Sequence, residues 1–276
     1  MRTGYPWARS PRCPMEVIIR PDHQQATLLA ARIIEKELRA RPTLVLGLAT
    51  GRTMESVYAC LVRRHRETGL DFSRCRTFNL DEYIGIPPQH PGSYGSYMRQ
   101  HLFSRVNLDP AHTHLPDGMA EDLAAESRQY ETLIAQAGGI DLQLLGLGGD
   151  GHIGFNEPLS ALLSRTREKA LTPATRQQNA PMFGGDPAQV PPRANTMGVG
   201  TILDSRRCLL LATGAEKAAI LSKAVEGPIT AMVTASALQL HPKCQVVVDA
   251  EAAAQLQGIE YYHWIFNNEP EWADFR

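Results

Sequence analysis

Short apolar runs alternate with helical patterns of apolar residues along the first half of the chain. Residues 16–20 form an apolar run that we expect to be an edge strand, and residues 43–49 form a longer run, typical of a parallel strand buried on both faces. Residues 21–40 carry leucine and isoleucine at helical spacing, which predicts an amphipathic helix that ends before Pro42. The same criteria predict strands over residues 76–80 and 140–147 and helices over residues 54–67, 93–106 and 120–137.

The regular pattern lapses after Gly151 and returns at Cys208. The intervening stretch is rich in proline, glycine, arginine and glutamine, and a long irregular segment inside a compact domain is often an active-site lid. We place such a lid at about 160–192, with a plain surface excursion as the alternative. Beyond it, the pattern predicts strands over residues 208–212 and 245–248 and helices over residues 215–225, 230–240 and 250–257.

Alternating strands and helices imply an α/β fold: a doubly wound, mostly parallel, Rossmann-like sheet flanked by helices. We expect a flexible tail over residues 1–14 and a single domain over residues 15–276. Ligands of such sheets bind at the carboxyl ends of the strands, so the turns that follow the strands should meet at one edge.

Composition narrows the classes of partner. The formal net charge is -1 with acids and bases mixed along the chain, which excludes the one-sided basic surface of a nucleic-acid-binding protein. The five cysteines are widely spaced and form no CxxC pair, which favours a reducing, cytoplasmic location over a disulfide framework or a zinc site. No apolar run approaches the roughly 20 residues of a membrane helix, so we expect no membrane partner.

Four residues form the turn after the strand at 43–49: Thr50, Gly51, Arg52 and Thr53. A glycine turn at the start of a helix exposes backbone N–H groups at the positive end of the helix dipole, and arginine adds a fork of donors suited to phosphate. The turn therefore predicts a phosphate site. The alternative is an ordinary strand-to-helix turn with Thr53 as the helix N-cap.

Asp81 and Glu82 are adjacent carboxylates at the end of the strand predicted at 76–80. Neighbouring side chains of an extended backbone point to opposite sides, so only one carboxylate should face the cleft while the other pairs elsewhere. A carboxylate beside a bound phosphosugar could act as a general base. A solvated acidic turn is the alternative.

Glycines at 146, 148 and 151 match the GxGxxG dinucleotide fingerprint. We reject that interpretation, because the following HIGFNEP has no helical period and the fingerprint requires a helix to begin at once. In the same segment, His152 lies between Asp150 and Glu157, and such carboxylates orient an imidazole that carries a proton near neutral pH. A structural histidine is the alternative; no HxxxH or cysteine partner supports a metal site.

Two further features involve cations. Lys217 follows the strand at 208–212, in the first turn of a predicted helix, where it could bind phosphate as a point charge or simply be solvated. His112 and His114 lie in a polar loop, and we interpret them as surface residues.

Several of these segments together resemble the glucosamine-6-phosphate deaminase (glucosamine/galactosamine-6-phosphate isomerase) family. The resemblance extends from about residue 15 to residue 249. The segments that carry it are LGLATG, TFNLDEYIGI, HPGSY, LGLGGDGHIGFNEP, SRTR, GVGT, GAEKA and LQLHPK.

The resemblance implies an enzyme of aminosugar catabolism that converts glucosamine 6-phosphate to fructose 6-phosphate and ammonia, with no cofactor. His152 would handle the ring-opening proton, with Asp150 and Glu157 orienting it, and Asp81 would move a proton from C2 to C1. The turn at residues 50–53 and Lys217 would hold the phosphate of this small-molecule substrate.

This chain departs from the family pattern at two places. An arginine of the family's lid reaches the phosphate, and its position falls on Pro181 here; we hypothesise that Arg52 supplies the missing charge. A candidate allosteric site for N-acetylglucosamine 6-phosphate matches at Ser160, Arg167 and Lys169. Its C-terminal tyrosine is shifted to about His263, with Tyr261 or Tyr262 as substitutes, and the chain has an N-terminal extension of about residues 1–14, so we do not expect activation. A homo-oligomer is one open possibility.

Three other functions stay open at this stage: a galactosamine-6-phosphate deaminase, a 6-phosphogluconolactonase-like hydrolase, and a non-enzymatic sugar-phosphate sensor. A sensor would need a DNA-binding segment, and none is visible in the sequence.

Overall fold

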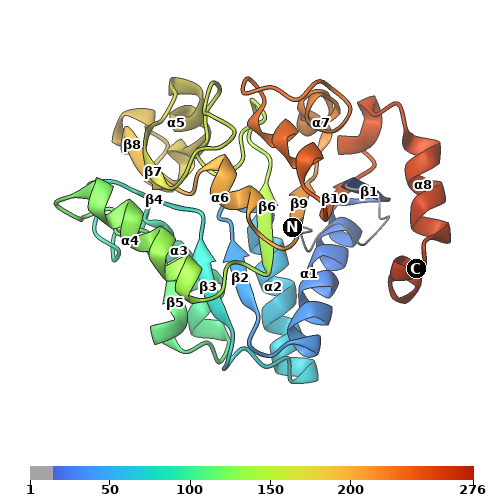
Figure 1. Ribbon diagram of the computed structural model, residues 1–276, viewed down its shortest axis with the longest axis horizontal. Coiled ribbons are helices and arrows are strands. Elements are labelled where there is room, and N and C mark those ends of the chain that lie inside the picture. The colour runs from blue at the N-terminus through green and yellow to red at the C-terminus, as the bar shows by residue number, and fades with distance from the viewer. Residues whose placement is uncertain (1–14) are drawn as a thin grey trace, which may run out of the picture.

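The computed structural model describes residues 15–276, so the tail expected over residues 1–14 lies outside the described part. Seven parallel strands form the central sheet (Figure 1). Their spatial order is β1 (Met15–Arg20), β10 (Cys244–Asp249), β9 (Cys208–Ala212), β6 (Leu142–Gly146), β2 (Val45–Leu48), β3 (Arg76–Asn79) and β5 (Thr113–His114). The predicted parallel, doubly wound sheet and the edge position of its first strand are confirmed.

Helices flank this sheet (Figure 1). They are α1 (His23–Ala40), α2 (Arg52–Thr68), α3 (Tyr94–His101), α4 (Leu123–Gln136), α6 (Val199–Leu203), α7 (Ala218–Val225) and α8 (Ile259–Asn268). β9 is apolar and buried along its whole length, and β10 is buried throughout with an apolar run at residues 246–248. Burial on both faces explains their continuous apolar runs, because helices cover the sheet from either side.

The direction of winding reverses between β2 and β6. From β2 the chain proceeds to β3 and β5 on one side, whereas from β6 it proceeds to β9 on the other. Since β2 and β6 are hydrogen-bonded neighbours, the loops that leave their carboxyl ends diverge and leave a crevice between them. This switch point is where a ligand of such a sheet is expected.

A second, three-stranded antiparallel sheet was not predicted. It consists of β4 (Asp81–Tyr83), β8 (Arg193–Thr196) and β7 (Arg167–Ala170), with β8 in the middle. These strands are short and carry charged or polar residues, so they lack the apolar runs that identified the main strands. The segment expected to be an irregular lid, about 160–192, is therefore partly regular: it contains β7, α5 (Pro173–Asn179), η3 (Ala180–Phe183) and η4 (Pro187–Gln189).

Some local expectations were wrong. Residues 230–240 and 250–257 form only the 3-10 helices η6 (Thr234–Leu240) and η7 (Ala252–Gln255), and α8 was missed. His114 lies in the short strand β5 and not in a loop; it is half-buried, its ring stacks on Phe78 at 4.6 Å, and burial lowers its pKa. The other 3-10 helices are η1 (Phe103–Arg105), η2 (Pro110–His112), η5 (Ala215–Lys217) and η8 (Pro270–Phe275).

Candidate active site

A cavity of about 180 Å³ opens at the carboxyl ends of β2, β6 and β9, at the switch point of the sheet. Its wall combines the turns after these strands with the first residue of β4 and with side chains of α5, in the segment expected to be a lid. Seven of the residues predicted from the sequence line it: Thr50, Gly51, Arg52, Thr53, Asp81, His152 and Lys217.

One end of the cavity has the chemistry of an anion site. Helix α2 begins at Arg52, and its N-cap is Gly51, which has a φ of 117° and no side-chain cap hydrogen bond. The N–H groups of Arg52 and Thr53, at the positive end of the helix dipole, are available to a ligand, whereas that of Met54 donates to the carbonyl of Gly51 at 2.9 Å. The alternative in which Thr53 caps this helix was wrong.

Lys217 approaches the same end from the other side of the switch point, at the end of η5 after β9. Burial lowers the pKa of its ammonium group, and the charge of Arg52 acts in the same direction. Glu216, which also lines the cavity, raises it. Two cations that repel each other across an open cavity are stabilised by a ligand with two negative charges, such as a phosphate monoester.

The two adjacent carboxylates of β4 separate as predicted. Asp81 lines the cavity and is 5% exposed, and burial together with the charge of Glu82 raises its pKa to about 7. Glu82 faces away and accepts the backbone N–H groups of Tyr83, Tyr94 and Gly95 at 2.8–2.9 Å, which anchors the N-terminus of α3. Asp81 is thus the carboxylate available to a substrate, with a pKa suited to a general base near neutral pH.

His152 also lines the cavity, in the loop that follows β6. Its Nδ1 lies 2.6 Å from Oδ1 of Asp150 and 3.7 Å from Oε2 of Glu157. Burial opposes the ionisation of Asp150, but hydrogen bonding to His152 outweighs it and lowers the pKa of the carboxyl group. These contacts orient the ring, as a proton carrier requires. No helix follows β6 directly, so the loop does not have the dinucleotide-binding geometry.

Glu157 is 2% exposed and also accepts the backbone N–H of Thr172 at 3.0 Å. Within residues 15–276, the Asp150, His152 and Glu157 group is also the one whose ligand atoms, all within 4.8 Å of one another, could hold a metal ion. A group that orients the imidazole explains this arrangement equally well, because His152 pairs closely with Asp150 and Glu157 accepts the N–H of Thr172.

The comparison with known proteins now identifies the family. Residues 23–247 match the family described as glucosamine-6-phosphate isomerases/6-phosphogluconolactonase. The chain belongs to this family. The resemblance drawn from FNLDEY and GHIGFNEP is thereby confirmed.

Curated relatives cover nearly the whole chain. A glucosamine-6-phosphate deaminase of Hahella chejuensis is 51% identical over 91% of this chain and 95% of the relative. One of Arthrobacter sp. is 50% identical over 94% of this chain and 99% of the relative. A solved structure, described as a monomeric glucosamine-6-phosphate deaminase, is 43% identical with a TM-score of 0.85, covering 87% of this chain and 100% of that one. The 6-phosphogluconolactonase of Trypanosoma brucei, at 22% identity and a TM-score of 0.66 over 87% and 98% of the chains, shares the fold alone.

The three residues matched to the family's effector site lie outside the cavity wall. Arg167 and Lys169 are on β7, where Arg167 donates to Oδ1 of Asn156 at 2.8 Å, and the buried hydroxyl of Ser160 has no hydrogen-bond partner among the described residues. Tyr262, one of the proposed substitutes for the C-terminal tyrosine, donates instead to Glu226 at 2.8 Å. That no effector activates this chain stays a prediction.

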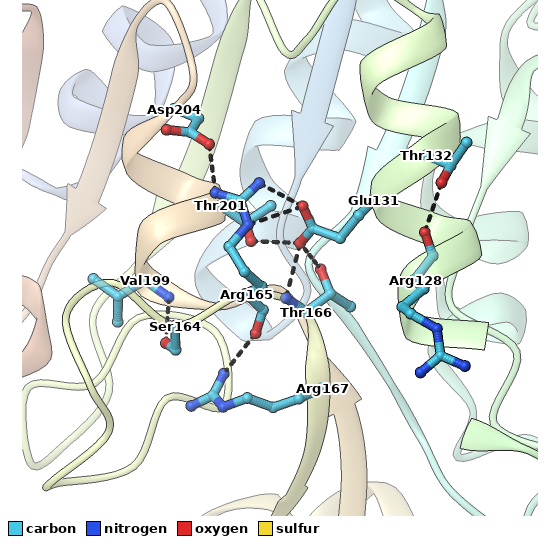
Figure 2. A network of polar contacts seen from close by, with 10 residues as sticks. All are labelled: Arg128, Glu131, Thr132, Ser164, Arg165, Thr166, Arg167, Val199, Thr201 and Asp204. Atoms are coloured by element: carbon cyan, nitrogen blue, oxygen red, sulfur yellow. Dashed lines mark hydrogen bonds and ion pairs between the residues drawn. The ribbon is translucent and has the colours of Figure 1, made fainter. Parts of the chain in front are cut away.

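A half-buried carboxylate holds the chain just before β7, next to these residues. Figure 2 shows Glu131 of α4, whose Oε1 accepts from the N–H and hydroxyl of Thr166 and from the hydroxyl of Thr201 at 2.5–2.8 Å. Arg165 bridges Glu131 and Asp204. Burial alone would raise the pKa of Glu131, yet these donors lower it. The charged carboxylate therefore connects α4 to the residue before β7.

Sequence reasoning missed several residues of the wall. Tyr94, Gln178 and Asn179 line the cavity. Tyr94 lies in the HPGSY segment that contributed to the resemblance, whereas nothing in the pattern around Gln178 and Asn179 marked them out from the rest of the lid. Their role depends on how α5 folds over the cavity, which is a tertiary property.

Proposed function

We propose that this chain catalyses the isomerising deamination of glucosamine 6-phosphate to fructose 6-phosphate and ammonia. The observation that supports this most is that Asp81 and His152 line one cavity together with the anion-binding end formed by residues 50–53 and Lys217. Converting an aldose to a ketose requires two proton carriers in different positions and no redox cofactor, and this cavity offers both.

The phosphate determines how the sugar lies. Bound at the N-terminus of α2 and beside Lys217, it directs the rest of the sugar toward β4 and the loop after β6. The reacting carbons C1 and C2 then reach the two proton carriers. The phosphate thus contributes binding energy remote from the reaction that positions the reacting end.

The protons move in sequence. His152 moves the proton of the O1 hydroxyl to the ring oxygen, which breaks the C1–O5 bond and opens the ring to the aldehyde. Asp81 removes the proton from C2 while the aldehyde oxygen takes a proton from the C2 ammonium group, which gives an enolamine, and the same carboxyl returns the C2 proton to C1. The resulting C2 imine adds water and releases ammonia, which leaves the ketone of fructose 6-phosphate. Asp150 and Glu157 orient the imidazole throughout.

Arg52 takes the place of the family's lid arginine in this proposal. Arg52 lines the cavity, whereas Pro181 in η3 stands at the lid position. The arginine of α5, Arg176, cannot substitute in the present conformation, because its guanidinium donates to the carbonyls of Pro187 and Val190 at 2.8 and 3.2 Å.

The expected cellular location and oligomeric state are also proposals. We place the enzyme in the cytoplasm, where its phosphosugar substrate would occur; no helix among the described residues is long and apolar enough to cross a membrane. A homo-oligomer is supported by the exposed Leu159 and Leu163, which are 75% and 85% accessible. The solved relative is described as monomeric, so light scattering must decide for this chain.

The substrate can be tested directly by incubating the protein separately with glucosamine 6-phosphate, galactosamine 6-phosphate and 6-phosphogluconolactone. The proposal predicts ammonia release that is fastest with glucosamine 6-phosphate. Faster release from the galactose epimer would change the substrate, and lactone hydrolysis without ammonia would overturn the reaction. Sugar-phosphate binding without turnover would indicate a sensor.

A further inference from the structure

Thr196 lies directly opposite Asp81 in the antiparallel pair of β4 and β8. Both side chains are buried, Thr196 completely. The threonine hydroxyl accepts the backbone N–H of Phe155 at 3.1 Å and lies 3.4 Å from Oδ2 of Asp81. One hydroxyl therefore contacts both the candidate base and the loop that carries His152.

The direction of these contacts follows from the chemistry of the hydroxyl. It has one proton and two lone pairs, and the Phe155 N–H occupies a lone pair. The proton is left for Asp81 or for the carbonyl of Met197, which is also 3.4 Å away. An ionised carboxylate is the stronger acceptor, so the hydroxyl donates to Asp81 when that group is charged.

The approach of the His152 loop depends on Gly154. Its φ is +55°, and a Cβ at this position would lie 3.1 Å from the hydroxyl of Thr196 and 3.4 Å from Oδ2 of Asp81. The backbone thus packs closely against the pair, and the loop is held there by the Phe155–Thr196 hydrogen bond.

We infer that Thr196 is a positioning residue for the reaction: its hydroxyl holds one oxygen of Asp81, favours the ionised carboxylate, and fixes the distance between Asp81 and the His152 loop. This inference rests on the proposed deaminase function, in which Asp81 is the base. The other carboxylate oxygen is left to take the C2 proton.

Other groups also act on Asp81, and a test must leave them in place. Glu82 on the same strand raises its pKa, and His152 from the loop lowers it. Three tyrosines close to it are neutral at ordinary pH, and burial raises their pKa values further: Tyr83 on β4, Tyr94 on α3 and Tyr130 on α4. Substitution of Thr196 removes none of these groups.

The experiment compares Thr196→Val, which keeps the shape without the hydroxyl, with Thr196→Ser, which keeps the hydroxyl. The readout is the pH profile of kcat/KM for glucosamine 6-phosphate. In Thr196→Val the acid limb should move to higher pH by about half to one unit, because a hydrogen bond to the charged form is lost. The plateau value of kcat/KM should fall on the order of tenfold, because the carboxylate of Asp81 is no longer held in position. Thr196→Ser should retain the wild-type limb.

An unshifted acid limb in Thr196→Val, or a Thr196→Ser profile equal to that of Thr196→Val, would overturn the inference. Thermal melting checks the fold, and Thr196→Ala replaces Thr196→Val in the same comparison if the valine variant does not unfold cooperatively. Wild-type protein that releases no ammonia would refute the proposed function itself, whereas an active wild type with unshifted variants refutes the role of Thr196 alone.

Discussion

Nδ1 of His152 lies 2.6 Å from Oδ1 of Asp150, two residues earlier in the same loop. This short-range pair and the contact with Glu157 at 3.7 Å orient the ring from within one loop, and they leave the other ring nitrogen for the substrate. The pair defines one half of the proposed site, and Asp81 on β4 defines the other.

Replacing Asp150 with asparagine should lower kcat by about tenfold to a hundredfold, because the imidazole loses the charged acceptor that orients it. KM should change little, since Asp150 does not line the cavity. Steady-state kinetics with glucosamine 6-phosphate measures both constants. A kcat equal to wild type would remove Asp150 from the mechanism.

Asp81→Asn should lower kcat by about 10²–10⁴-fold, the usual contribution of a general base. Ammonia release is the measurement, and equilibrium binding of the phosphosugar serves as the control, because the phosphate end of the cavity is untouched. A variant that binds normally and reacts at the wild-type rate would exclude Asp81 as the base.

The pH dependence of stability follows from the same carboxyl. Burial raises the pKa of the Asp81 carboxyl from 3.8 to about 7 in the folded protein. Its contribution to folding stability is therefore fully present below the unfolded pKa and is lost as the pH rises through about 7. Asp81→Asn removes this loss and should melt above wild type at pH 8 by at least about 2 °C, the shift that ~1 kcal/mol produces in a domain of this size. Melting curves at pH 5 and pH 8 test this. A difference in melting temperature between the two proteins that is no larger at pH 8 than at pH 5 contradicts this prediction.

Arg52→Gly should raise KM for glucosamine 6-phosphate by roughly tenfold to a hundredfold, the equivalent of about 1.5–3 kcal/mol for a charge-assisted phosphate contact. Arg66→Gly is a matched control, because Arg66 is an exposed arginine in the last turn of the same helix. If KM barely moves in Arg52→Gly, or moves equally in both variants, Arg52 does not compensate for Pro181.

Chelation should leave the activity unchanged. The proposed chemistry uses only acid–base groups, and the potential ligand set of Asp150, His152 and Glu157 is already engaged in orienting the ring. Turnover before and after treatment with EDTA and dialysis is the measurement. A loss of activity that a divalent metal restores would assign these residues to a metal instead.

Much of this site was predictable because strand ends converge. Thr50–Thr53, Asp81, His152 and Lys217 each follow a strand of the parallel sheet or lie beside one, and the topology brings the ends of parallel strands to one edge. The separation of Asp81 from Glu82 followed from the alternation of an extended backbone.

Other parts depended on pairing between distant segments. Thr196 meets Asp81 only because β8 pairs with β4 across 115 residues, and both strands are too short and polar to be seen as strands in the sequence. Glu131 similarly binds a segment more than thirty residues away. Such contacts are tertiary properties that local patterns do not encode.

The most direct test of the central claim is to run the reaction on glucosamine 6-phosphate in D₂O and to analyse the product by NMR. If Asp81 alone moves the proton from C2 to C1, ammonia and fructose 6-phosphate form in equal amounts, and deuterium incorporated from solvent occupies one of the two hydrogen positions at C1. Deuterium at both positions, or no ammonia at all, would contradict the account.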